Sequence, residues 1–441
     1  MIRTAFFLAT TLFFTSCKPQ QHAPITSEAD TLQTSKGQRV DLAAPYATKS
    51  TERFCEVIGW PRDKTPIAPQ GFSVTRFADS LDNPRWIYIG PNGDIFISEA
   101  STLTSGLKAF AGRVFVPKKV NSGNTSKSAN NIILLRDANH DGIPELRTTF
   151  LSGLNQPFGM LVLGNNFYVA NTDGVLVFPY QPGQTSISGK GKKILSLPAG
   201  GYNNHWTRNL LASKDGKKIY ITVGSSSNVG EHGIDHEQRR ANILEINPDG
   251  SGERVYAYGL RNPQGMGWAP GTNTLWTSVN ERDELGDELV PDFLTSVKDG
   301  GFYGWPYAYW GQHPDPRVKE QRPDLVTQAI IPDVPLGAHT ASLGLAFDEK
   351  QLMPGQYKGG AFIGQHGSWN RSSLSGYEIA FVPFSGGRPS GKPTHFLTGF
   401  IADSSASKVY GRPVGVAFTP TYLLVADDAG NTIWCVRPAN Q

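Results

Sequence analysis

A strand and turn unit that recurs along the chain is the feature that most constrains its fold. Each copy starts with a polar residue and Pro or Gly, continues through an apolar strand, a turn and a second apolar strand, and ends in polar residues, as in NPRWIYIGPNGDIFISEA. Copies begin near residues 83, 155, 205, 261, 341 and 411. This spacing is typical of four-stranded blades with loop insertions. The pattern predicts an all-β fold, a six-bladed β-propeller, with two β-sandwiches as the alternative.

The composition agrees with many short strands joined by turns. The chain has 441 residues, 48 of them Gly and 31 Pro, and only 18% are charged. The formal net charge of +3 and the absence of a Lys/Arg run argue against a nucleic acid partner.

The N-terminus has the features of a secretory signal. Arg3 precedes an apolar run over residues 5–14 that is too short to span a bilayer. The run ends in FTSC, which resembles a bacterial lipobox, whose cysteine, here Cys17, is lipidated. A plain signal peptide with a chance cysteine is the alternative. We expect a signal peptide over residues 1–16, a flexible tether over 17–50 and the propeller over 51–441. This arrangement predicts a periplasmic protein, and Lys18 after the cysteine indicates the outer membrane.

Two cysteines remain in the predicted folded region. Cys55 and Cys435 lie near its two ends. Because the termini of a ring meet and the compartment is oxidising, we expect a disulfide between them. Two buried free thiols are the alternative.

Polar clusters fall at the predicted strand ends, and a ring would gather them around one axis. His205 opens the third copy of the repeat, where a neutral imidazole could accept a proton from a hydroxyl group; an ordinary loop histidine is the alternative. The acidic stretch VNERDELGDE could hold Ca²⁺ through oxygen ligands or be a solvated loop. Its candidate ligands are Glu281, Asp287 and Glu288.

Two arginines near strand ends suit an anionic ligand. Arg371 and Arg412 could each bind a carboxylate in a bidentate manner, the alternative being surface salt bridges. In RDANHDGIPELR, an EF-hand-like start is followed too early by Glu145, which indicates a hairpin turn rather than a calcium loop. The sequence has no C-x-x-C-H haem motif and no G-x-S-x-G elbow.

The chain resembles a known family over about residues 70–438. GLRNPQGMGW, VNERDELGDELVPDFL, DGGFYGWPYAYWGQH, LGAHTASLGLAF, GQHGSWNRS and GRPVGVAF are together similar to the soluble-type sugar dehydrogenases that depend on pyrroloquinoline quinone (PQQ). Within them, the resemblance is to the L-sorbosone dehydrogenase-like branch.

The resemblance implies a cofactor and a mechanism. PQQ, which carries three carboxylates, would lie across the channel mouth with Ca²⁺ polarising its reactive carbonyl. His205 would be the general base, and Asp287 would lie near the sugar. The implied cofactor contacts are Asn228, Arg371, Arg412, Arg208 and Gln156. The chain departs from the family at Ser227 and Tyr410, where arginines are usual. Fewer cations would therefore face PQQ, unless Arg208, Arg261 or Arg282 compensates.

These observations predict a PQQ-dependent dehydrogenase that oxidises an aldose or related aldehyde sugar to a lactone or acid. Since the chain has no haem motif, its electrons would leave to a separate acceptor. A calcium-dependent lactonase on the same propeller and a non-catalytic, partner-binding propeller are the alternatives. The paired arginines favour the quinone over the lactonase, and a partner-binding propeller would not need His205.

The anchor gives a first testable prediction. The mature protein should begin at an acylated Cys17 and partition with membranes, because the lipid replaces the apolar segment that is removed. Mass spectrometry of the purified mature chain checks this, and an unmodified Cys17 there would contradict it.

Overall fold

The computed structural model describes residues 31–33, 39–102 and 128–439. Six mainly antiparallel sheets of four or five strands dominate this part of the chain, and five of them are built from strands that are consecutive or nearly so in sequence. The first three sheets contain β5 (Pro84–Ile89), β6 (Ile95–Glu99), β7 (Asn131–Arg136) and β8 (Leu146–Leu151); β9 (Met160–Leu163), β10 (Asn166–Asn171), β11 (Gly174–Pro179) and β12 (Lys192–Ser196); and β13 (Leu210–Ala212), β14 (Ile219–Val223), β15 (Asn242–Ile246) and β16 (Arg254–Tyr258), with β20 (Gly301–Phe302) added in parallel to β16.

The other three sheets follow the same plan. They contain β17 (Pro263–Trp268), β18 (Leu275–Val279), β19 (Pro291–Ser296) and β23 (Val334–Ala338); β24 (Ser342–Phe347), β25 (Ala361–Gln365), β26 (Glu378–Val382) and β29 (Thr394–Leu397); and β32 (Pro413–Phe418), β33 (Leu423–Asp427), β34 (Thr432–Pro438) and β4 (Phe72–Ala78). The first strand of each sheet therefore starts one to five residues after a copy of the sequence repeat begins.

Small elements decorate the large sheets. Short strands are β1 (Thr31–Gln33) with β2 (Arg39–Asp41), β3 (Glu56–Val57) with β31 (Lys408–Val409) and β30 (Ile401–Asp403), β21 (Ala308–Tyr309) with β22 (His313–Pro314), and β27 (Phe384–Ser385) with β28 (Arg388–Pro389). The helical elements of the described residues are single turns, α3 (Pro323–Val326), η2 (Ile234–Glu237) and η3 (Gly355–Tyr357). The predicted all-β class is confirmed, and none of the described helices is long and apolar enough to cross a membrane.

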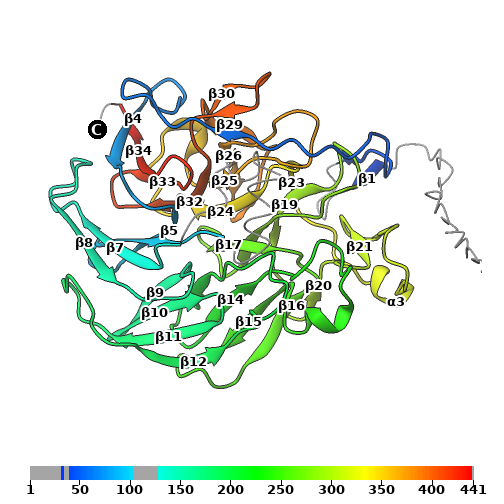
Figure 1. The fold of residues 1–441 in the computed structure, drawn as a ribbon, viewed down its shortest axis with the longest axis horizontal. Helices are drawn as coiled ribbons and strands as arrows, with labels where there is room; N and C mark the ends of the chain where they lie inside the picture. Colours follow the sequence, from blue (N-terminus) through cyan, green and yellow to red (C-terminus); the bar gives the residue numbers. More distant parts are fainter. Residues whose placement is uncertain (1–30, 34–38, 103–127, 440–441) are drawn as a thin grey trace, which may run out of the picture.

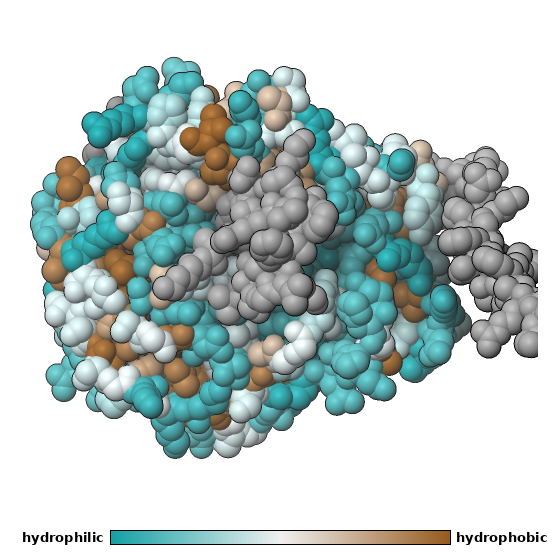
Figure 2. Space-filling model, viewed as in Figure 1, coloured by the Kyte–Doolittle hydropathy of each residue, from teal (hydrophilic) through white to brown (hydrophobic). Residues whose placement is uncertain are grey.

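The sheets are arranged around a common centre, in the manner of a β-propeller (Figure 1). The first strands contact one another in succession: β9 with β13, β13 with β17, β17 with β24, β24 with β32, and β32 with β5. Hydrophobic clusters fill the spaces between neighbouring sheets; one of them joins Trp86 and Phe96 of the first sheet to Phe167 and Phe178 of the second. On the face viewed in Figure 2, hydrophobic residues are scattered among hydrophilic ones.

The last sheet is completed by a strand from the beginning of the described chain. β4 pairs with β34 in antiparallel fashion over Phe72–Ala78, with Cys435 opposite Thr75. In Figure 1 the two strands lie side by side near the C-terminus. A further cluster, which includes Ile87 and Leu424, packs this last sheet against the first.

The predicted disulfide is wrong, because Cys55 and Cys435 are both free and buried. Successive side chains of a strand point to opposite faces of the sheet. Trp434 and Val436 therefore face the cluster that contains Cys55, whereas Cys435 faces the opposite cluster. The pairing of β4 with β34 joins the two ends of the fold instead.

The predicted tether extends too far toward the fold. Leu42 is buried in the core beside the β17–β19 sheet, and the amide of Tyr46 donates to the carbonyl of Leu285 at 2.8 Å. Ser50 and Thr48 accept hydrogen bonds from the amides of Gly286 and Asp287. We call residues 42–60 the strap, since Figure 1 shows this segment crossing the molecule from β2 toward β4. The predicted signal peptide and Cys17 lie outside the described residues.

The free thiols give a second prediction. Unfolding without a reductant should expose both Cys55 and Cys435 to alkylation, and the melting temperature should be the same with and without dithiothreitol. Peptide mapping after iodoacetamide treatment checks this. A Cys55–Cys435 peptide pair or a reductant-sensitive melting temperature would contradict it.

Candidate functional site

Several polar residues at strand ends lie at the same edge of the sheets. Because neighbouring strands are antiparallel, the first strand of each sheet starts at the edge where the second strand ends. His205 and Arg261 precede β13 and β17, while Asn280 follows β18 and His366 follows β25. The predicted convergence of strand-end polar residues is therefore present.

His205 is held in a defined orientation at this edge. Its Nδ1 lies 2.9 Å from the carbonyl oxygen of Ser225. Since a carbonyl can only accept, Nδ1 carries the proton and Nε2 is left as an acceptor. Burial, then the charge of Arg261, lowers the pKa of His205 to about 3, so the imidazole is neutral at neutral pH.

Glycine at position 224 lets β14 end close to this histidine. A Cβ there would lie 2.6 Å from the Cβ of His205 and 2.4 Å from Oδ1 of Asn262. The following serines are fixed by the buried Glu237, which accepts hydrogen bonds from the amides and hydroxyls of Ser226 and Ser227. Ser227 therefore has a structural role in the place of the expected arginine.

Arg208 supports the histidine loop rather than a ligand. It is fully buried and donates to the carbonyl oxygens of His205, Thr207 and Pro198 at 2.7–2.8 Å. Burial, then the charge of Arg240, lowers its pKa to about 9.

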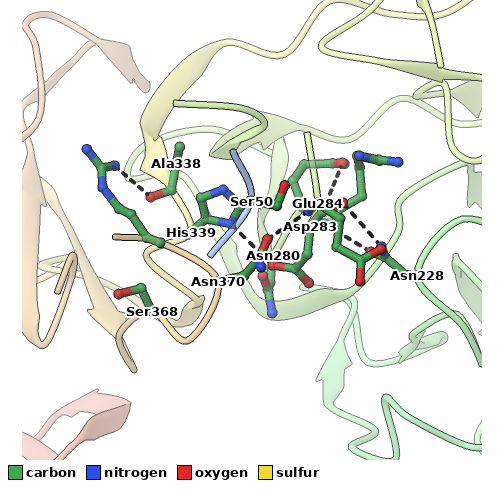
Figure 3. Close-up of polar contacts among 12 residues, drawn as sticks. Ser50, Asn228, Asn280, Asp283, Glu284, Ala338, His339, Ser368 and Asn370 are labelled. Atoms are coloured by element: carbon green, nitrogen blue, oxygen red, sulfur yellow. Dashed lines mark hydrogen bonds and ion pairs between the residues drawn. The ribbon is translucent and has the colours of Figure 1, made fainter. Parts of the chain in front are cut away.

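Asn228 lies in a polar network with Asp283 and Glu284 (Figure 3), and Arg261 joins it through hydrogen bonds. Arg261 donates to the main-chain oxygen of Asn228 at 3.1 Å and to its Oδ1 at 2.9 Å. It also binds the carbonyls of Asn280 and Glu281 and pairs with Asp283 at 3.2 Å. The sequence indicated Arg261 only as a substitute cation, yet it organises the loop after β18.

His339 extends the network on its other side. Its Nδ1 lies 3.2 Å from Oδ1 of Asp283 and its Nε2 lies 2.8 Å from the carbonyl of Gly286. Although burial opposes it, the hydrogen bond with Asp283 raises the pKa of His339. Burial acts to raise the pKa of Asp283. The hydrogen bond from His339, and then the charge of Arg261, outweigh it, so that the pKa of Asp283 is lowered.

The three predicted calcium ligands are not brought together. Within the described residues no group of three or more His, Cys, Asp or Glu side chains could hold a metal ion. Glu281 is buried and accepts from the amide of Arg282, and its pKa is raised by burial to about 7. Asp287 accepts from the amide and hydroxyl of Ser372. Glu288 pairs with Arg371 at 2.5 Å.

The same contacts show what Asp287 and Arg371 do in the fold. The carboxylate of Asp287 ties the loop after β18 to the loop after β25 through Ser372. Arg371 is engaged by Glu288, but its Nε is buried and has no hydrogen-bond partner among the described residues. A buried donor of this kind costs free energy unless a ligand accepts from it.

The remaining predicted cofactor contacts face backbone groups. Arg412 is buried and donates to the carbonyls of His366 and Gly367 at 2.9 and 3.0 Å. Gln156 donates to the carbonyl of Ser101 at 2.9 Å. Tyr410 lies away from these groups and accepts from Lys64 at 2.7 Å.

A second histidine at this edge was missed by the sequence analysis. Nε2 of the buried His366 lies 2.9 Å from Asp428, which also pairs with Arg85. Burial, then the charge of Arg412, lowers the pKa of His366 to about 4. Its place in GQHG directly after a strand end was the available signal.

The EF-hand-like loop is a turn, as predicted. Asp137 accepts from the amides of Asp141 and Gly142 and from the hydroxyl of Tyr422. Its oxygens are therefore used by the hairpin and by Tyr422.

Comparisons with known proteins agree with this architecture. The sequence profile of the glucose/sorbosone dehydrogenase family matches residues 190–368, and a TrAA12-like profile matches residues 316–439. The resemblance to sugar dehydrogenases is thereby confirmed, and the sorbosone-like branch stays a prediction.

Two curated relatives are similar in sequence. A Borreliella burgdorferi protein described as uncharacterized is 28% identical over 83% of this chain and 89% of its own length. An aldose sugar dehydrogenase of Escherichia coli K12 is 29% identical over 41% of this chain and 44% of its own.

Solved structures share the fold. The holo pyranose dehydrogenase PQQ domain of Coprinopsis cinerea has a TM-score of 0.67 at 19% identity, covering 87% of this chain and all of that one. A calcium structure of a Trichoderma reesei family AA12 enzyme has a TM-score of 0.67 at 17% identity, covering 88% and 99% of the two chains. Since both identities are low, these likenesses establish the fold alone.

The low pKa of His205 gives a third prediction, on stability. An unfolded histidine titrates at about 6.5, so between that pH and about 3 the unfolded chain binds a proton that folded His205 does not. Stability contributed at this position is complete above about pH 6.5 and is lost as the pH falls. His205→Asn removes this titration, so its free energy of unfolding should fall less than that of the parent between pH 7.5 and 4.5. Urea unfolding at several pH values measures it, and parallel pH curves would contradict the assignment.

Proposed function

We propose that the protein is a PQQ-dependent dehydrogenase that oxidises the C1 hydroxyl of an aldose, or a sorbosone-like aldehyde sugar, to a lactone or acid. We further propose that the six sheets are the blades of one closed propeller with the active site at the edge described above. The observation that carries the proposal is the neutral His205, whose Nε2 is available as a proton acceptor. The family profile over residues 190–368 supports the reaction class.

The residues of the site fit an anionic, planar cofactor. The unpartnered Nε of Arg371 and Nε of Arg85 are buried donors at the polar edge, and an acceptor there would satisfy them. Arg371 and Arg85 would hold cofactor carboxylates, and Asn228 would contact the cofactor beside them. The fungal pyranose dehydrogenase domain is a PQQ domain, which supports the choice.

PQQ, when bound, supplies the hydride acceptor. His205 accepts the proton of the sugar hydroxyl at Nε2, while Ser225 holds the ring through Nδ1. Arg261 keeps Asn228 and the loop after β18 in place through its five hydrogen bonds. Arg208 fixes the main chain beside the base by donating to the carbonyls of His205 and Thr207.

The proposed calcium site differs from the predicted one in its ligands. Glu281, Asp287 and Glu288 are engaged elsewhere, so they do not fit the ion. We propose that Ca²⁺ is bound through main-chain oxygens of the 280–288 loop together with the cofactor. The calcium structure of the similar AA12 enzyme supports keeping the ion.

The cellular setting is proposed from the sequence. The lipobox-like FTSC favours a lipid-anchored protein of the bacterial periplasm, held to the outer membrane through Cys17. A separate quinone or cytochrome would receive the electrons.

The fourth prediction tests the base. After reconstitution with PQQ and Ca²⁺, His205→Ala should lower turnover of aldoses by about 10²–10⁴-fold, the usual range for a positioned base, and still bind PQQ. Absorbance titration measures binding, and a dye acceptor measures turnover. Because the pKa of His205 is about 3, no activity rise between pH 6 and 8 should depend on it.

His395→Ala is the matched control, since this histidine lies on β29 with a side chain that is 80% exposed. It should leave turnover unchanged. If His205→Ala turns over at the parent rate and His366→Ala does not, the base is His366 and our assignment is wrong. A parent protein that never binds PQQ but hydrolyses lactones would favour the lactonase.

A further inference from the structure

An open surface cavity of about 660 Å³ is lined by the strap and by the loop after β18. The strap contributes Tyr46, Lys49, Ser50 and Glu52 to its lining. The propeller contributes Glu284, Arg317 and Asn370. This volume is in the range of ligand pockets.

The cavity adjoins the candidate active site through Glu284. The Glu284 amide donates to Oδ1 of Asn370 at 2.8 Å, and its carboxylate lies 3.5 Å from Nδ2 of Asn228. Figure 3 shows Ser50, Asn370 and Glu284 in the same group as Asp283 and His339. The side chain of Glu284, which lines the cavity, therefore lies directly beside Asn228.

The charges of the lining balance. Lys49 and Arg317 are opposed by Glu52 and Glu284, and Arg317 pairs directly with Glu284. A lining with no net charge favours an uncharged ligand over a strongly anionic or cationic one.

The hydrogen-bonding groups suit a molecule rich in hydroxyls. Ser50 accepts from the amide of Gly286, which leaves its own O–H as a donor. Asn370 uses Oδ1 for Glu284, which leaves its NH₂ group. Tyr46 is 54% exposed, and burial raises its pKa, so its ring is accessible with a neutral hydroxyl. An aromatic ring beside such donors can stack on the apolar face of a sugar ring.

We propose that this cavity is a saccharide subsite that holds the second sugar unit of a disaccharide or longer aldose whose reducing end lies at His205. The inference rests on the proposed function for the position of the reducing end. It assigns to the strap a role in substrate selection, because Tyr46, Lys49 and Glu52 belong to it.

The fifth prediction compares cellobiose and maltose with glucose. In the reconstituted full-length protein, Tyr46→Ala should raise KM for at least one disaccharide about three- to tenfold, as expected for one lost stacking contact, with glucose kinetics unchanged. Glu52→Gln unbalances the charge without removing volume and should also act on disaccharides alone. Tyr258→Ala, at a 38% exposed tyrosine on β16, is the matched control and should change neither.

Calorimetric titration of the same proteins with cellobiose and maltose separates this inference from the proposed function. Disaccharide binding that weakens in Tyr46→Ala supports the subsite even if no sugar is oxidised, a result that would overturn only the dehydrogenase proposal. Oxidation of glucose with no binding or kinetic difference between parent and Tyr46→Ala on either disaccharide would overturn the subsite. Equal loss on glucose and disaccharides in Tyr46→Ala would also overturn it.

Discussion

The pairing of β4 with β34 is the interaction on which the rest of the structure depends. It places a strand from the start of the fold at the outer side of the last sheet, with Cys435 opposite Thr75. The last sheet can then pack against the first through Ile87 and Leu424. Because every sheet is thereby fixed relative to the same centre, the strand ends that carry His205, Arg261 and His366 meet at one edge. Hydrogen-bonded strand pairing does this without the covalent bridge that the sequence had indicated.

Most charged groups at that edge stabilise the loops themselves. Arg261 satisfies the carbonyl groups of Asn280 and Glu281, and Arg412 those of His366 and Gly367. Buried carbonyl groups need such donors, since an unpaired one costs free energy comparable to a lost hydrogen bond. These hydrogen bonds hold the loops in place around the groups that remain available. His205 stands out among these because its ring is oriented by a main-chain carbonyl, and because desolvation and the charge of Arg261 keep it neutral.

The strap links the first described residues to the loop that carries the polar network. Its Tyr46 amide donates to the carbonyl of Leu285, and its Ser50 and Thr48 hydroxyls accept from the amides of Gly286 and Asp287. The same loop carries Asp283 and Glu284 toward Asn228. A change in the strap would therefore reach the site through a loop of only a few residues. This arrangement explains why a segment that reads as a polar tether can line a cavity beside the proposed reaction centre.

The sequence by itself determined the class of fold, the approximate start of each first strand and the edge where polar residues gather, because alternating apolar residues and turn-forming glycines are local signals. It also placed His205 correctly at that edge. Only the tertiary structure decided which charged side chains remain free for a ligand. Asp287 is taken by Ser372, Glu288 by Arg371, and Cys435 is turned away from Cys55 by the alternation of β34. The partners in each case come from distant parts of the chain, and a side chain's availability depends on those partners rather than on its neighbours in sequence.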